Sequence, residues 1–100
     1  MTTATLGSAK GRLHSYDFLV YAYLQRGDDA SAKKLVDKVA ASGIKFDSEI
    51  STQHALAAIP ARYALERHDW AAAEKLEIDP KALPFAEAIT RFARGMGAAN

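Results

Sequence analysis

Apolar residues recur with helical spacing along most of the chain, and no stretch alternates with the period of two that marks a β-strand. The pattern predicts an all-α protein with five helices. They are expected from His14 or Ser15 to about residue 26, from Asp28 or Asp29 to about residue 42, from Asp47 or Ser48 to about His68, from Trp70 to about Leu76, and from Pro84 to about residue 97.

The first two helices are expected to form a tight antiparallel hairpin, Tyr16 to Val39, on which the rest of the chain packs. Gly27 is placed to end the first helix in a left-handed conformation, Asp28 or Asp29 to cap the second, and Gly43 to close it. The predicted buried face of the first helix consists of Phe18, Leu19, Ala22 and Tyr23. That of the second consists of Ala32, Leu35, Val36 and Val39.

Two later features refine this pattern. Pro60 lies inside the third predicted helix, where it removes the hydrogen bond to the Leu56 carbonyl. We therefore expect a bend there, or alternatively two helices that meet at Ile59-Pro60. The fifth helix is expected to carry its apolar side at Phe85, Ala88, Ile89, Phe92 and Met96.

An internal repeat links the two hairpins at an offset of 41 residues. This offset places Asp28-Asp29-Ala30-Ser31-Ala32 over Asp69-Trp70-Ala71-Ala72-Ala73, and Gln25-Arg26 over Glu66-Arg67. Repeated helix–turn–helix units are typical of solenoid proteins, in which each unit buries its apolar face against its neighbour.

The first unit resembles a tetratricopeptide repeat, with Tyr16, Leu19, Tyr23, Gly27-Asp28 and Ala32 at the characteristic spacing. The second unit is similar but degenerate, with Trp70, Ala73 and Pro80 matching the pattern and Pro60 and His68 departing from it. Its offset also exceeds the usual period of about 34 residues. The stretches around Tyr16 and Pro60 look like the C-terminal segment of larger bacterial proteins of this type.

The resemblance implies a short right-handed solenoid in one domain, residues 14–100, after a flexible lead-in of residues 1–13. Repeat 1 would span about 14–43, a degenerate repeat 2 about 48–80, and a capping or partial third-repeat helix about 84–97. A plain five-helix bundle without superhelical stacking is the alternative.

The resemblance further implies a concave face made by the first helix of each unit, and that face is the expected peptide-binding groove. The candidate groove residues are Asp17, Tyr21, Gln25, Arg62, Glu66, Arg91 and Arg94, with His14, Leu24, Ala58, Leu65 and Glu87 beside them. The guanidinium groups and the Tyr21 ring would suit an extended peptide that carries carboxylates. Alternatively, Tyr21 belongs to the core and the arginines are only solvated.

Composition and charge exclude several function classes. The formal net charge is +1, which gives no electrostatic attraction to nucleic acid or to anionic lipid. The absence of cysteine excludes disulfides and thiol chemistry. No apolar run approaches the roughly 20 residues of a membrane span, and no signal-peptide core is present. We therefore expect a soluble, cytoplasmic protein.

Candidate catalytic and metal-binding residues do not form a recognisable site. His14, His54 and His68 match no metal-ligand spacing, although a zinc site could in principle be assembled across helices with Glu49, Glu66 or Asp69. A Ser15–His14–Asp17 arrangement lacks a nucleophile elbow and an oxyanion loop. We expect no catalytic residues, no metal and no cofactor.

The sequence thus favours a non-enzymatic interaction scaffold that binds a peptide or a partner helix. The first alternative is an assembly segment of a larger helical solenoid, or a homodimer that forms through exposed end helices. The second and more distant alternative is a helical metal-binding protein or enzyme.

Overall fold

A computed structural model describes the backbone of residues 3–100 and the side chains from residue 12 onward. These residues form five α-helices and no strand, which confirms the all-α prediction for the described part of the chain. The helices are α1 (Thr3–Gln25), α2 (Asp29–Ala41), α3 (Ile50–Glu66), α4 (Trp70–Glu74) and α5 (Pro84–Ala99).

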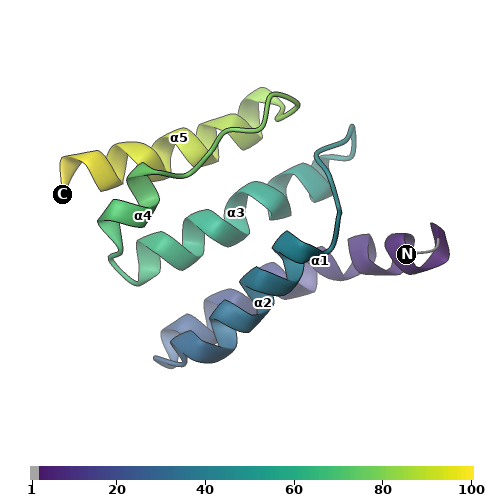
Figure 1. Cartoon of the computed structure of the whole chain (residues 1–100), viewed down its shortest axis with the longest axis horizontal. Helices are drawn as coiled ribbons and strands as arrows, with labels where there is room; N and C mark the ends of the chain where they lie inside the picture. The colour runs from purple at the N-terminus through teal and green to yellow at the C-terminus, as the bar shows by residue number, and fades with distance from the viewer. Residues whose placement is uncertain (1–2) are drawn as a thin grey trace.

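The helix α3 runs through the middle of the molecule and contacts all the others (Figure 1). It packs against α1 on one side and against α5 on the other. The helix α2 lies against α1 and α3, and the short α4 lies against α3 and α5. The first helices of the two hairpins and the final helix therefore lie next to one another in the order α1, α3, α5.

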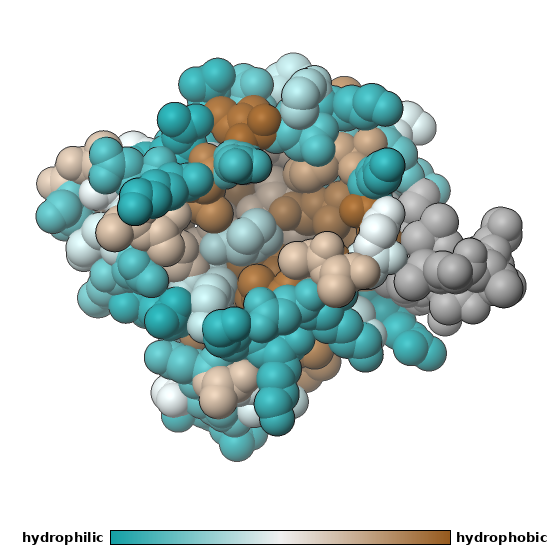
Figure 2. All heavy atoms as spheres, in the orientation of Figure 1, coloured by the Kyte–Doolittle hydropathy of each residue, from teal (hydrophilic) through white to brown (hydrophobic). Residues whose placement is uncertain are grey.

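The main described apolar cluster lies where α1, α2 and α3 meet. Its buried members are Leu13, Val20, Ala32, Val39, Ala55 and Ile59. The α2 residues Leu35 and Val36 pack against it, so the predicted apolar stripe of α2 is confirmed. On the face seen in Figure 2, hydrophilic residues cover the outer rim and hydrophobic residues gather toward the middle.

The turn between α1 and α2 is repeated between α3 and α4. Gly27 adopts a left-handed conformation with φ of 75°, and His68, 41 residues later, adopts the same conformation with φ of 56°. Asp28 then caps α2 by accepting a hydrogen bond from the Ser31 amide, and Asp69 caps α4 by accepting one from the Ala72 amide. These findings confirm the predicted turn and caps.

Backbone hydrogen bonds around the two turns also match. The Asp28 amide donates to the Tyr23 carbonyl at 2.8 Å, and the Asp69 amide donates to the Ala64 carbonyl at 2.9 Å. The 41-residue repeat in the sequence is therefore a repeat of local structure, including a non-glycine residue held where glycine is favoured.

The start of the first helix differs from the prediction. Helix α1 already begins at Thr3, so it does not start near His14 or Ser15, and Ser15 does not cap it. The expected lead-in of residues 1–13 is helical from residue 3, and residues 1–2 lie outside the described residues. Leu13, which is 1% exposed and belongs to the main apolar cluster, anchors the helix in front of the predicted start.

The predicted buried face of α1 is also wrong in part, because Phe18 is 69% exposed and Leu19 is 39% exposed. The buried side of α1 instead carries Leu13, Asp17 and Val20, which are spaced by about one helical turn. The cause lies in the packing: α2 and α3 both approach α1 from that side, and no described element covers Phe18.

Helix α3 is continuous through Pro60, so the alternative of two helices that meet at Ile59-Pro60 is wrong.

Helix α5 faces the core with small residues instead of its large ones. Its buried positions are Ala86, Thr90, Ala93 and Gly97, while Phe85, Phe92 and Met96 remain at least 37% exposed. An ideal Cβ at Gly97 would lie 2.5 Å from the Trp70 carbonyl oxygen. The close approach of α4 thus requires small residues on α5, and the large ones turn toward α3 and solvent.

A buried amide ties α5 to α3. Gln53 is fully buried; its Nε2 donates to the Asp47 and Lys81 carbonyls, and its Oε1 accepts from the Leu83 amide. Because Leu83 immediately precedes α5, these bonds fix where that helix starts relative to α3.

Candidate functional site

Among the described residues, a hollow lies between α3 and α5. It has a volume of about 400 Å³ and is mainly apolar. Alanines on both helices leave the space open, and Ile89 and Phe92 form its wall on α5. The lining residues are Ala58, Ala61, Arg62, Leu65, Glu66, Ala88, Ile89 and Phe92.

A second hollow of about 270 Å³ adjoins the first between α1 and α3. Its lining residues are His14, Asp17, Phe18, Tyr21 and Arg62. Arg62 lines both hollows, so the two hollows lie next to each other along α1, α3 and α5. We call this surface the α1–α3–α5 groove.

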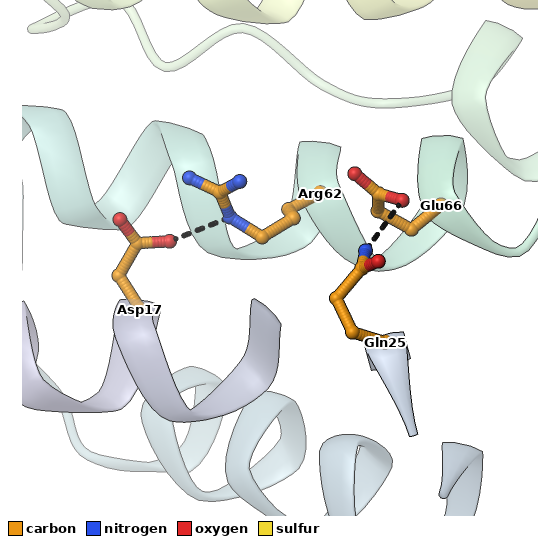
Figure 3. A network of polar contacts seen from close by, with 4 residues as sticks. All are labelled: Asp17, Gln25, Arg62 and Glu66. Carbon is orange, nitrogen blue, oxygen red and sulfur yellow. Dashed lines mark hydrogen bonds and ion pairs between the residues drawn. The ribbon is translucent and has the colours of Figure 1, made fainter. Parts of the chain in front are cut away.

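The side chain of Arg62 is held in place by α1. Its Nε lies 3.0 Å from Oδ1 of Asp17, and its guanidinium carbon lies 5.2 Å from the centre of the Tyr21 ring. Figure 3 shows that the bond to Asp17 is made by Nε, while the two Nη atoms stand at the end of the side chain. The Arg62 side chain is 30% exposed, whereas that of Asp17 is 11% exposed. Arg62 can therefore keep its bond to Asp17 and still donate from its Nη atoms to a ligand.

A second polar link joins the same two helices. It lies one turn farther along α3 and two turns farther along α1. Nε2 of Gln25 donates to Oε2 of Glu66 at 3.1 Å, between two residues that are equivalent in the 41-residue repeat (Figure 3). Nearby, the Arg67 guanidinium stacks on the Tyr63 ring and lies 3.6 Å from an Asp29 oxygen. Polar contacts thus link this end of α3 to α1 and α2, whereas the hollow between α3 and α5 is mainly apolar.

The charges along the groove are mixed. Arg62 supplies a cation, and Asp17 and Glu66 supply carboxylates within one or two turns of it. Because Asp17 already balances much of the Arg62 charge, the apolar hollow offers more binding energy than the guanidinium alone.

The structure brings together five of the seven predicted groove residues: Asp17, Tyr21, Gln25, Arg62 and Glu66. Tyr21 is 40% exposed beside Arg62 and is not a core residue. His14, Ala58 and Leu65 line the hollows as expected.

Arg91 and Arg94 do not line this groove. They border a separate hollow with Glu74, Gly95 and Ala98, and Arg91 forms an exposed ion pair with Glu87 at 3.1 Å. The predicted register of α5 placed its charged side in the groove, but the charged side faces away because Ala86 and Ala93 pack against the rest of the molecule.

Sequence reasoning missed five groove residues: Phe18, Ala61, Ala88, Ile89 and Phe92. An offset of 30 residues, from Ala58 to Ala88 and from Arg62 to Phe92, aligns α5 with α3 and would have identified two of them. No sequence motif within α5 indicates this offset.

The three histidines are exposed and lie on different parts of the molecule. Among the described residues, no group of three or more His, Cys, Asp or Glu side chains lies close enough to hold a metal ion. No helix in the described part of the chain combines the length and apolar character that a membrane crossing needs.

Comparison with known proteins returns no matching family model, no matching curated protein and no matching solved structure.

Proposed function

We propose that this chain is a non-enzymatic interaction module that binds a partner peptide or helix in the α1–α3–α5 groove. The observation that carries the proposal is the open apolar hollow between α3 and α5, which Arg62 joins to the second hollow. Apolar grooves edged by a few oriented polar groups are the usual receptors for peptide segments.

We further propose that the helices form a short, right-handed, tetratricopeptide-like stack. Three features support this arrangement: the matched turns at Gly27 and His68, the matched caps at Asp28 and Asp69, and the neighbouring order α1, α3, α5. In such a stack the groove is the face that the first helices share.

The ligand chemistry follows from the lining. A bulky apolar side chain of the partner fills the hollow between Ala58, Ala88 and Phe92, and a carboxylate of the partner accepts from the Nη atoms of Arg62. The apolar contact supplies most of the affinity, and the ion pair sets the orientation.

The test is a selection of 12-residue peptides from a random phage-displayed library on the full chain. Selected peptides are expected to share a bulky apolar residue close to Asp or Glu. Their affinity, measured by fluorescence anisotropy, should fall at least about tenfold in Ala88→Trp, which fills the hollow. Arg62→Gln should weaken binding about three- to tenfold.

The matched control is Ala98→Trp, which places the same side chain on the other side of α5, beside Glu74. This variant should bind as the wild type does. Failure to enrich any peptide, or equal binding by Ala88→Trp, would reject the groove as the binding site.

A further inference from the structure

The two hollows of the α1–α3–α5 groove lie on either side of α3. The larger, of about 400 Å³, lies between α3 and α5, and the smaller, of about 270 Å³, lies between α1 and α3. Because the axes of packed helices lie about 8–10 Å apart, the two hollows are separated by about the same distance. A ligand that fills both hollows must therefore cross α3.

Exposed aromatic rings stand at both hollows. Phe92 lines the larger hollow and is 64% exposed, and Phe18 and Tyr21 line the smaller one and are 69% and 40% exposed. Arg62 lines both hollows, and its guanidinium lies over the Tyr21 ring. Grooves lined by exposed aromatic rings are the surfaces on which proline-rich segments dock.

The floor of the groove offers no backbone donors to a ligand. All its lining residues lie within α1, α3 and α5, where backbone N–H groups are already bonded along each helix. A β-strand ligand gains affinity from main-chain hydrogen bonds to a sheet edge, and the described residues include no strand. A polyproline II segment needs no such edge, and its prolines have no N–H to leave unpaired.

The spacing of the hollows also matches polyproline II. This helix has three residues per turn and rises about 3.1 Å per residue, so side chains at positions i and i+3 share a face about 9.3 Å apart. Same-face residues of a strand are about 6.6 or 13 Å apart, which fits less well. Positions i and i+7 of an α-helix, about 10.5 Å apart, also fit, but a short peptide helix is marginal in water, whereas polyproline II is preformed.

Building on the proposed function of the groove, we propose that its partner is a proline-rich segment that crosses α3 in the polyproline II conformation. Two of its apolar side chains, three residues apart, occupy the hollows. A bulky one fills the hollow between α3 and α5, and a proline ring lies against Phe18 and Tyr21. An acidic residue between them in the sequence of the partner accepts from the Nη atoms of Arg62, so its charge complements the guanidinium.

Two proline-rich peptides of the same composition test the spacing. In each, a central leucine has a glutamate on both sides, and the other positions are proline except for two glycines. In the first peptide the glycines lie four positions before and after the leucine, so prolines remain three positions away. In the second peptide the glycines take those two places. Fluorescence anisotropy with the full chain should show at least about tenfold weaker binding of the second peptide, because one hollow stays empty.

A substitution in the smaller hollow tests where the proline ring lies. Phe18→Ala should weaken binding of the first peptide about three- to tenfold, because an aromatic wall is removed, and should leave binding of the second peptide unchanged. Ile50→Ala is the matched control. Ile50 is also 69% exposed but lines neither hollow, so this variant should bind both peptides as the wild type does.

Equal affinity of the two peptides, or unaltered binding of the first peptide by Phe18→Ala, would overturn the polyproline II partner. If their binding is nevertheless lost in Ala88→Trp, the groove stands as the binding site and only the conformation of the partner is wrong. Tighter binding of an alanine-rich helical peptide with leucines seven residues apart would show that the partner is a helix instead. No binding of either proline-rich peptide would also overturn this partner, and the peptides selected from the random library then decide the groove separately.

Discussion

The side chain of Gln53 shows how one buried residue can position a binding surface. It bonds to the connector before α3 and to the connector before α5, and it is fully buried. Since the α3–α5 hollow depends on the spacing of these two helices, Gln53 supports the groove without lining it.

We predict that Gln53→Leu lowers the free energy of unfolding by about 2–4 kcal/mol, because the Leu83 amide and the Lys81 carbonyl lose their partners in a buried setting. Urea denaturation measures this change. The control is Gln25→Leu, which removes one exposed bond to Glu66 and should cost less than about 0.5 kcal/mol. Equal effects of the two substitutions would contradict the role given to Gln53.

The cap residue Asp28 predicts a pH dependence. Hydrogen bonds from the side chain and backbone of Ser31 hold the pKa of Asp28 below its ordinary value of 3.8. A lowered pKa in the folded state means that the ionised carboxylate stabilises the fold above pH 3.8 and loses this effect as the pH falls through the folded-state pKa. Asp28→Asn retains a capping oxygen that does not titrate.

We therefore expect the Tm difference between wild type and Asp28→Asn to stay constant from about pH 7 to pH 5, and to change in favour of the variant below about pH 4. Thermal melts followed by circular dichroism measure it. A difference that stays constant down to about pH 2 would show that the cap contributes nothing through its charge.

At the scale of single residues, the sequence predicted what local chemistry determines. Gly27, Asp28 and Asp69 could be assigned because turns and caps need particular side chains. Gln53 could not be, because a polar residue in a helix gives no sign that two distant connectors will surround it. Phe18 was misassigned because spacing shows that a face is apolar but not that another element covers it.

At the scale of elements, α5 depends on close contact with α4. An added Cβ at Gly97 would lie 2.6 Å from the Glu74 backbone nitrogen and 3.1 Å from the Ala73 Cβ. These atoms belong largely to backbone, which cannot turn aside as a flexible side chain would.

We predict that Gly97→Ala destabilises the protein by about 1–3 kcal/mol, since α5 must shift away from α4. Gly95→Ala is the matched control: its Cβ would meet nothing within 4 Å, so it should stabilise the helix by about 0.5–1 kcal/mol. Thermal unfolding measures both changes. A destabilised Gly95→Ala, or an unaffected Gly97→Ala, would contradict this packing.

Helix number and order could be read from the pattern, since four of the five starts lie within three residues of their predicted positions. The start of α1 could not, because Gly7 and Gly11 weaken the local helical signal and only tertiary contact at Leu13 reveals the longer helix. The rotation of α5 could not be predicted either: both its apolar stripe and its small-residue stripe fit helical spacing, and the approach of α4 decides between them.

At the scale of the whole molecule, the neighbouring order α1, α3, α5 explains where the groove lies, because its two hollows lie between successive helices of that order. The sequence predicted the repeat but not the hollow, which exists because Ala88 occupies on α5 the place that Ala58 occupies on α3. Which small residues face each other depends on the rotation of α5, which the sequence left open.

The most direct test of the groove is an NMR titration of the isotope-labelled chain with 3-phenylpropionate, which combines an aromatic ring with a carboxylate. Its eleven heavy atoms, at about 0.3 kcal/mol each, correspond to a dissociation constant of a few millimolar. We expect the largest amide shift changes at Ala58, Arg62, Ala88 and Phe92, and we expect them to vanish in Ala88→Trp but to persist in Ala98→Trp. Neutral 3-phenylpropanol should bind more weakly. Shift changes centred elsewhere on the molecule, or unaltered by Ala88→Trp, would contradict the proposed binding site.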